Sequence, residues 1–225
     1  MTSITIAVDG TAASGKGTLA KKLAAHFGFH HLDSGALYRL VALGVLEAKG
    51  DPASEADALA AARAIDHRRC NDPAIRAAGM GNVASVVSAY PSVRATLLEF
   101  QRTFARLPPG TVIDGRDIGT VVCPDATVKL FVDAVPEVRA HRRWLELSAA
   151  GAAPPAGKSP SEAEILADIR ARDARDKNRA IAPLKPAPDA RLLDTSNMGI
   201  DAAFAAALAL VKPGVENALK AHAKG

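Results

Sequence analysis

The residues best suited to chemistry lie near the N-terminus, in the run Asp9-Gly10-Thr11-Ala12-Ala13-Ser14-Gly15-Lys16-Gly17-Thr18. Its small residues allow the backbone to curl so that several N–H groups point at one centre. A helix that starts where the run ends adds partial positive charge, and Lys16 adds a full one. Two glycines with four residues between them, followed by lysine, therefore predict a phosphate-binding loop.

The flanking sequence supplies the context that such a loop requires. Ile4–Val8 before it has the composition of a buried strand, and Thr18–Phe27 after it has helical spacing. An ordinary strand-to-helix turn is the alternative, but it gives no reason for the lysine. Because glycine stands directly after Lys16, the hydroxyl nearest to a bound Mg²⁺ is expected to be that of Thr18, acting through water.

A second candidate group follows another apolar run, Thr111–Ile113, and reads Asp114-Gly115-Arg116-Asp117. A carboxylate at the end of a buried strand is where phosphate-loop proteins organise Mg²⁺, so Asp114 is the second metal candidate. A strand that ends in an Asp turn is also commonplace, and only the pairing with the phosphate loop favours the functional interpretation. Asp33 is a weaker candidate, because capping a helix explains it equally well.

A third group is an arginine stripe. Arg172, Arg175 and Arg179 share one face of a predicted helix, with Asp176 among them. A solvated face with ion pairs is the structural alternative. The Pro/Gly-rich segment Ala149–Pro160 precedes the stripe, and guanidinium groups match phosphate oxygens bidentately, so a moving helix could carry these arginines onto a bound nucleotide.

The elements that must position these groups alternate between strand and helix. The predicted strands are Ile4–Val8, His30–Leu32, Thr111–Ile113, Val128–Val132 and Arg191–Leu193. The predicted helices are Thr18–Phe27, Ala36–Ala48, Glu55–Asp66, Pro73–Ala89, Ser92–Leu107, Pro136–Ser148, Ser161–Arg179 and Ile200–Val211. Such alternation predicts the α/β class, with helices on both faces of a parallel five-stranded sheet.

Composition excludes several other classes of protein. The 225 residues are 48% hydrophobic and 4% aromatic, with a net charge of +4, which fits a globular enzyme for small anions better than a nucleic-acid-binding protein. Cys70 and Cys123 lack a zinc-type spacing, so we expect free thiols in a reducing compartment. The first residues lack the basic region of a signal peptide, and the longest apolar stretch, Ala202–Val211, is too short to span a bilayer. We therefore expect a cytoplasmic protein that binds neither nucleic acid nor membrane.

The motifs together resemble bacterial cytidylate kinase, a nucleoside monophosphate kinase. The resemblance covers nearly the whole chain and is carried by the phosphate loop and by three more specific blocks. These blocks are Asp33-Ser34-Gly35-Ala36-Leu37-Tyr38-Arg39, Asp114-Gly115-Arg116-Asp117-Ile118-Gly119-Thr120 and Arg172-Asp173-Ala174-Arg175-Asp176-Lys177-Asn178-Arg179. It implies a three-layer P-loop kinase in which the γ-phosphoryl group of ATP is transferred to CMP or dCMP, with Mg²⁺. It also implies a CORE (1–35, 108–148 and 183–225), an NMP-binding insertion (36–107) and a LID (149–182).

The resemblance further implies roles for single residues. Lys16, Arg116, Arg172 and Arg179 would be catalytic, and the loop Gly10–Thr18 together with Arg175 would bind ATP. The residues that would hold the sugar and phosphate of CMP are Ser34, Tyr38 and Arg39. The residues that would meet the cytosine edge are Ser85, Arg94 and Asp117. Asp176 would bind the ribose, and Arg116, Arg172 and Arg179 would bind phosphates.

The chemistry of the base-edge residues agrees with cytosine. A carboxylate such as Asp117 accepts from the N4 amino group, whereas Arg94 and Ser85 donate to O2 and N3. Uracil would present a carbonyl to Asp117 instead. The chain departs from the family pattern in 66–76, which is too short for the small β-sheet that many relatives carry in the insertion, and this puts the match of Ser85 in question.

Three rival interpretations remain open. A UMP or AMP kinase would share the loop and the lid but read a different base. A metabolite kinase of the shikimate type usually has Ser or Thr directly after the loop lysine. A non-catalytic nucleotide switch would have no task for the lid arginines and would need a guanine-reading Asn-Lys-x-Asp motif, which this chain lacks. We expect a monomer in each case.

Overall fold

A single parallel sheet forms the centre of the molecule. The computed structural model describes residues 3–77, 79–149 and 160–222. All five predicted strands are present, in the spatial order β2-β3-β1-β4-β5, and every neighbouring pair is parallel. Their bounds are β1 (Ile4–Gly10), β2 (His30–Asp33), β3 (Gly110–Gly115), β4 (Val128–Asp133) and β5 (Arg191–Asp194). The expected α/β fold is therefore confirmed.

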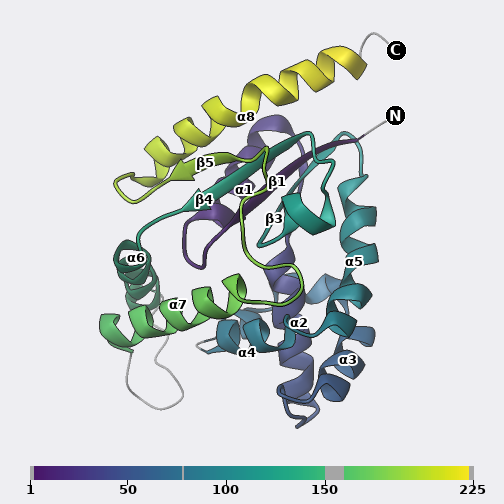
Figure 1. Cartoon of the computed structure of the whole chain (residues 1–225), viewed down its shortest axis with the longest axis vertical. Coiled ribbons are helices and arrows are strands. Elements are labelled where there is room, and N and C mark those ends of the chain that lie inside the picture. Colours follow the sequence, from purple (N-terminus) through teal and green to yellow (C-terminus); the bar gives the residue numbers. More distant parts are fainter. Residues whose placement is uncertain (1–2, 78, 150–159, 223–225) are drawn as a thin grey trace.

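Helices cover both faces of the sheet, which gives three layers (Figure 1). Successive side chains of a strand point to opposite faces, so β1 serves two cores. Ile6 and Val8 pack with α1 (Lys16–Phe27) and α8 (Ile200–His222). Ala7 packs on the other face with α2 (Ser34–Glu47) and α5 (Pro91–Ala105). Strands β1 and β3 are parallel neighbours, so their carboxyl ends lie side by side at the same edge of the sheet.

Helix α8 is longer than predicted, because it continues through Pro213 and Gly214 to His222. Its length and composition alone would allow Ile200–Ala221 to cross a membrane. However, Val211 and Val215 are fully buried in the core that α8 shares with the sheet. A Cβ atom on Gly214 would lie 2.5 Å from Cγ2 of Val128, so glycine allows the close approach to β4. Only 22% of the apolar window is buried, so α8 packs one face on the sheet and leaves the rest of its surface outside that core.

The described part of 36–107 contains helices and the turns between them and no strand, in agreement with the sequence analysis. They contain α2, α5, α3 (Glu55–Arg63), α4 (Met80–Val87) and the two 3-10 helices η1 (His67–Asn71) and η2 (Pro73–Arg76). One prediction is wrong: 73–89 is not a single helix. Gly79, with φ of 80°, separates η2 from α4. Asp72 caps η2, accepting from the N–H of Ala74.

The remaining helices, α6 (Pro136–Ala149) and α7 (Glu162–Lys177), lie beyond the carboxyl ends of the strands (Figure 1). Helix α7 begins with a capping box of Ser161 and Glu164. It packs on α6 through a small apolar cluster that includes Ile165 and Ile169, and it also contacts α4. The Pro/Gly-rich segment expected between α6 and α7 falls almost entirely on 150–159, outside the described residues.

Candidate active site

The phosphate loop has the curled geometry that its composition predicts. Gly10 has a φ of +156°, and a Cβ atom there would lie 2.0 Å from the carbonyl oxygen of Val132, so no other residue fits. Gly15 has a left-handed φ of 85° at the N-cap of α1, where none of the described side chains caps the first turn. The N–H groups of that turn are therefore free to bind an anion.

Lys16 is the first residue of α1 and lies at the base of this loop. It is 9% exposed, and its Nζ donates to the carbonyl oxygen of Thr11 at 3.3 Å. Burial, together with the nearby guanidinium of Arg116, lowers the pKa of Lys16 to about 7. An anion beside the ammonium would raise this pKa again, because an opposite charge favours the protonated form.

Asp114 is the second-last residue of β3 and lies beside the loop. It is buried, its Oδ1 lies 2.8 Å from Nε2 of His31, and a Cβ atom on Gly17 would lie 3.6 Å from its Oδ2. Its backbone oxygen accepts from Oγ of Ser34 at 2.7 Å. The exposed residue Thr18, on the first turn of α1, lines the same cavity. One carboxylate and one hydroxyl thus flank the start of α1, and oxygen ligands of this kind suit Mg²⁺.

Asp33 caps α2, which was one of its two predicted roles. Its Oδ1 accepts from the N–H of Ala36 at 3.1 Å, and its Oδ2 accepts from Nη2 of Arg39 at 2.5 Å. Burial raises the pKa of Asp33, but the Arg39 and Lys16 charges outweigh burial and bring the pKa below its usual range. The carboxylate therefore stays ionised and holds Arg39, a predicted CMP-phosphate ligand, at the edge of the cavity.

Arg94 and Asp117, two of the three base-edge candidates, form a buried ion pair between α5 and the end of β3. Nη2 of Arg94 donates to Oδ2 of Asp117, and Nη1 donates to the carbonyl oxygen of Ser88 at 3.3 Å. The guanidinium also lies 5.7 Å from the centre of the Tyr38 ring. Burial raises the pKa of Asp117 although the guanidinium faces it. A donor and an acceptor are therefore paired at one point of the cavity wall.

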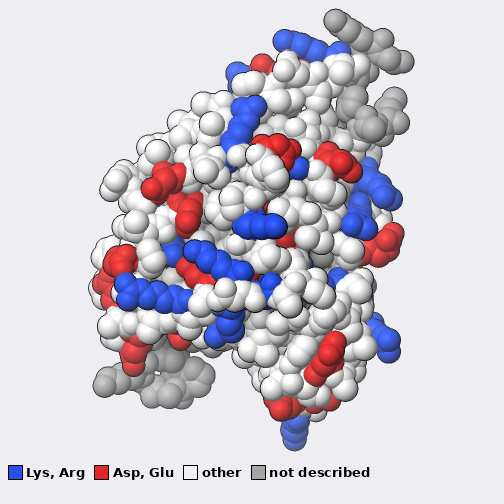
Figure 2. Space-filling model, in the orientation of Figure 1, with Lys and Arg blue, Asp and Glu red and all other residues white. Residues whose placement is uncertain are grey.

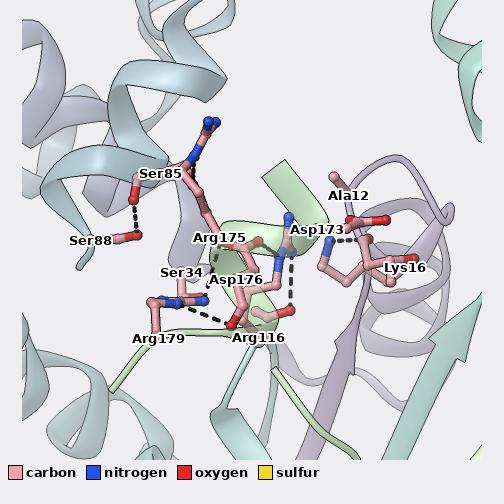
Figure 3. A network of polar contacts seen from close by, with 12 residues as sticks. Ala12, Lys16, Ser34, Ser85, Ser88, Arg116, Asp173, Arg175, Asp176 and Arg179 are labelled. Atoms are coloured by element: carbon pink, nitrogen blue, oxygen red, sulfur yellow. Dashed lines mark hydrogen bonds and ion pairs between the residues drawn. The ribbon is translucent and has the colours of Figure 1, made fainter. Parts of the chain in front are cut away.

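Asp176 is the centre of a polar network on α7 (Figure 3). Its Oδ2 accepts from Nε of Arg116 at 2.9 Å, and its Oδ1 accepts from Oγ of Ser85 at 3.3 Å. Nη2 of Arg179 lies 3.4 Å from the same Oδ1. Burial raises the pKa of Asp176, but the charges of Arg116 and Arg179 outweigh it and hold the pKa below its usual range. The network joins β3, α4 and α7.

Arg172 and Arg175, both on α7, have different surroundings. Arg172 lines the cavity, where burial and the charge of Arg116 lower its pKa to about 9. Arg175 turns toward α4, away from Lys16 (Figure 3). Its Nε donates to Oγ of Ser85 at 3.3 Å, and its Nη2 donates to Oδ1 of Asn82 at 3.2 Å. The ATP contact expected of Arg175 stays a prediction.

These groups surround one cavity of about 550 Å³, within the range of small-molecule sites. Most of the predicted site residues line it: Ala13, Ser14, Gly15, Lys16, Gly17, Thr18, Ser34, Tyr38, Arg39, Ser85, Arg94, Asp114, Arg116, Asp117, Arg172, Asp176 and Arg179. The predicted residues that lie outside its lining are Gly10, Thr11, Ala12 and Arg175. Segments far apart in the sequence therefore meet at one site.

The sequence analysis missed one end of the cavity. This end is lined by residues of α6, of the β5–α8 loop and of the start of α8, namely Arg142, Leu145, Glu146, Thr195, Met198, Gly199, Ile200 and Ala203. Nη2 of Arg142 donates to the carbonyl oxygens of Thr195 and Met198 at 2.6 and 3.1 Å, which joins the loop to α6. No local motif marks these residues. The pair Arg142-Arg143, on the helix that follows β4, was a weak signal of a site for anions.

Asp9, the residue before the loop, was also missed. It is 4% exposed, and its two carboxylate oxygens accept from the N–H groups of Ile118 and Gly119 at 2.8 and 2.7 Å. These amides directly follow Asp117. Asp9 therefore connects the strand that carries the phosphate loop to the turn that carries a base-edge candidate.

The surface around α7 carries both signs of charge. On the face in Figure 2, Lys and Arg side chains lie over the region of α7, and Asp and Glu side chains lie among them. On this face the two signs are mixed, and neither forms a broad patch.

A model of the family described as cytidylate kinase matches residues 6–213, which is most of the chain. The chain belongs to the cytidylate kinase family. Among curated cytidylate kinases, that of Rhodopseudomonas palustris strain TIE-1 is 58% identical over 92% of this chain and 95% of the relative. That of Nitrobacter winogradskyi strain Nb-255 is 56% identical over the same shares. The resemblance stated from the motifs is thus confirmed.

The fold of this cytidylate kinase family member also has a solved counterpart. The crystal structure of an uncharacterized protein from Eubacterium ventriosum aligns with a TM-score of 0.52. It covers 93% of this chain and 98% of the other, at 15% sequence identity. At that identity the likeness supports the fold alone.

Proposed function

We propose that this protein transfers the γ-phosphoryl group of ATP to CMP or dCMP, giving ADP and CDP or dCDP. The observation that carries the proposal is the single cavity in which a phosphate loop, a buried Arg94–Asp117 pair and the α7 arginines meet. Membership of the cytidylate kinase family supports the same reaction. Phosphoryl transfer needs mainly positioning and neutralisation of negative oxygens, and these are the groups that can supply both.

The ATP end of the proposed site has two parts. The loop 10–18 would hold the phosphates through its N–H groups and Lys16, while the missed end would hold the adenine. Leu145 and Ile200 are large apolar side chains that stay 49% and 63% exposed at the cavity. Apolar surface at a cavity mouth favours a flat aromatic base. Arg142 would stabilise this pocket, because it donates hydrogen bonds to the β5–α8 loop that forms part of the pocket wall.

The CMP end uses the base-edge pair. Asp117 would accept from the cytosine amino group and Arg94 would donate to its ring acceptors, with Ser34, Tyr38 and Arg39 at the sugar and phosphate. Ser85 currently bonds to Asp176, so CMP would compete for its hydroxyl. A site built to pair with one hydrogen-bond pattern rejects the wrong base by up to about 10⁴–10⁵-fold. UMP should therefore be a poor substrate.

The residues present also fit Mg²⁺. Asp114 presents one oxygen toward Gly17 at the start of α1, and Thr18 adds a hydroxyl, directly or through water. Mg²⁺ characteristically takes few protein ligands and keeps water and phosphate oxygens. Bound there, it would supply charge neutralisation at the phosphate oxygens.

The chain's own residues would do the rest of the work. Lys16, Arg116, Arg172 and Arg179 would surround the transferred group and neutralise its oxygens. The acceptor oxygen of CMP is already anionic at neutral pH, so no general base is required. Closure of the cavity would exclude water, which strengthens each of these charge interactions. We further propose that 36–107 acts as the NMP-binding insertion and 149–182 as the LID.

We also propose a monomer in the cytoplasm. One chain supplies every group of the site, and Cys70 and Cys123 are free thiols, in keeping with a reducing compartment. Size-exclusion chromatography with light scattering would test the oligomeric state.

An ADP-release assay with ATP and each ribo- and deoxyribonucleoside monophosphate tests the proposed function. CMP and dCMP should be the substrates with the highest kcat/KM, and UMP and AMP should be turned over far less efficiently. Higher efficiency with UMP or AMP would contradict the assignment of the base-edge pair. Absence of turnover with every monophosphate would contradict a kinase function altogether.

A further inference from the structure

A buried arginine joins the phosphate loop to the arginine-bearing helix. Arg139, in the first turn of α6, is 2% exposed. Its Nε donates to the carbonyl oxygen of Ala134 at 2.7 Å, and its Nη1 donates to that of Ala12 at 2.9 Å. Its Nη2 donates to Oδ2 of Asp173 at 2.6 Å. One guanidinium therefore contacts the end of β4, the phosphate loop and α7 at the same time.

Asp173 lies outside the lining of the cavity, whereas Arg172 and Asp176, on the same helix, line it. Oδ1 of Asp173 is buried and finds no hydrogen-bond partner among the described residues, so this carboxylate depends on Arg139. Because side chains have fixed spacing around a helix, holding Asp173 sets the rotation of α7. That rotation decides where Arg172 and Asp176 enter the cavity.

We propose that Arg139 and Asp173 are positioning residues, whose ion pair aligns α7 with the phosphate loop for phosphoryl transfer. This inference rests on the proposed function. A guanidinium that uses all three nitrogens forms a rigid connection, which a lysine cannot copy. Misplacement of catalytic groups by about 1 Å can cost about 10²-fold in rate. Most of the predicted CMP contacts, among them Ser34, Tyr38 and Arg39, lie outside α7. The main effect therefore falls on kcat, and the affinity for CMP changes little.

A second ion pair between the same two helices provides a matched control. Nη2 of Arg170 on α7 lies 2.5 Å from Oε1 of Glu137 on α6, and the two side chains are 59% and 57% exposed. This pair reaches neither the phosphate loop nor the cavity. An exposed pair contributes little to stability, and the proposal gives it no part in alignment.

The experiment compares Asp173→Asn, Arg139→Lys, their double variant and Glu137→Gln with the wild type. ADP release gives kcat and KM, calorimetry gives the Kd of CMP, and thermal unfolding gives Tm. Asp173→Asn and Arg139→Lys should each lower kcat by about 10–100-fold, with the Kd of CMP within about threefold of wild type. The double variant should be no slower than the slower single variant, because the two residues act as one unit. Glu137→Gln should match the wild type.

If both single variants keep the wild-type kcat, the proposal is overturned whatever happens to Tm. The pair would then have only a structural role. A loss confined to KM, or additive losses in the double variant, would overturn it as well. Arg139→Lys keeps a cation beside Asp173, so it decides the question even if Asp173→Asn does not fold. If the wild type turns over another monophosphate instead of CMP, the proposed function is wrong, and the same comparison with that substrate still decides the role of the pair.

Discussion

Asp9→Asn should remove a pH dependence of stability that one buried carboxylate causes. Asp9 accepts hydrogen bonds from the N–H groups of Ile118 and Gly119, and both bonds lower its pKa. Burial is the larger effect, and repulsion by Asp117 adds to it, so the pKa of Asp9 rises from 3.8 to about 7. The charged form is thus costly in the folded protein, even though it makes both hydrogen bonds.

The sign and size of the effect follow from that pKa. Between pH 3.8 and about 7 the folded state holds a proton that the unfolded chain has released. The contribution of Asp9 to stability is therefore complete below pH 3.8 and is lost as the pH rises through about 7. At about 1.4 kcal/mol per pH unit, with the slope flattening near the folded pKa, the free energy of unfolding falls by about 2 kcal/mol between pH 5 and pH 7 and by about 3 kcal/mol in all by pH 8.

Urea unfolding of the wild type and Asp9→Asn at pH 5, 6, 7 and 8 measures this directly. Asparagine does not titrate, so the difference in free energy of unfolding should move by about 3 kcal/mol in favour of the variant from pH 5 to pH 8. All other groups titrate in both proteins and cancel. A constant offset of about 1–3 kcal/mol against the variant is expected, because its amide nitrogen faces an N–H donor. Parallel curves would refute the reasoning.

Three further substitutions test the site itself. Lys16→Ala should lower kcat by about 10²–10³-fold, as for the loss of one focused electrostatic donor, and near-normal turnover in a steady-state assay would contradict its role. Asp117→Ala should reduce kcat/KM for CMP more than for UMP, and equal losses would count against base reading. Ser85→Ala should raise KM for CMP by about tenfold, the equivalent of one ordinary hydrogen bond, with little change in kcat. An unchanged KM would assign Ser85 to the α4–α7 contact alone.

The parts of the fold that sequence predicted are those fixed by local patterns. Three of the strands, β1, β3 and β4, were recognisable as short runs rich in apolar residues, and the phosphate loop as glycines and lysine at a set spacing. Gly79 shows the limit of such patterns: one residue with φ of 80° divides a segment whose apolar spacing suits a single helix. At Pro213 the error is the opposite one: the helix was predicted to end before this proline, but α8 continues through it. Burial of Val211 and Val215 on either side of Pro213 stabilises the helix there.

The parts of the site that sequence missed depend on contacts between distant segments. Arg142 reaches Thr195 only because α6 follows β4 and β4 pairs with β5 in the sheet. Neither residue has a neighbouring motif that would reveal the contact. Arg139 is similar, since its partners Ala12 and Asp173 lie on either side of it in the chain and far away. Sheet order, which brings these segments together, cannot be read from local spacing.

The cations of the site repel one another when no ligand is bound, which indicates that they serve to bind an anionic ligand. Burial and the charge of Arg116 lower the pKa of Lys16 to about 7 and that of Arg172 to about 9. A bound polyphosphate places negative charge beside these groups, and negative charge favours the protonated form of each lysine and arginine. The first substrate that binds therefore reduces the electrostatic repulsion among these cations. The second substrate needs the same cations in their protonated form, so its binding becomes more favourable. Because such coupling is reciprocal, ATP and CMP should each bind more tightly in the presence of the other.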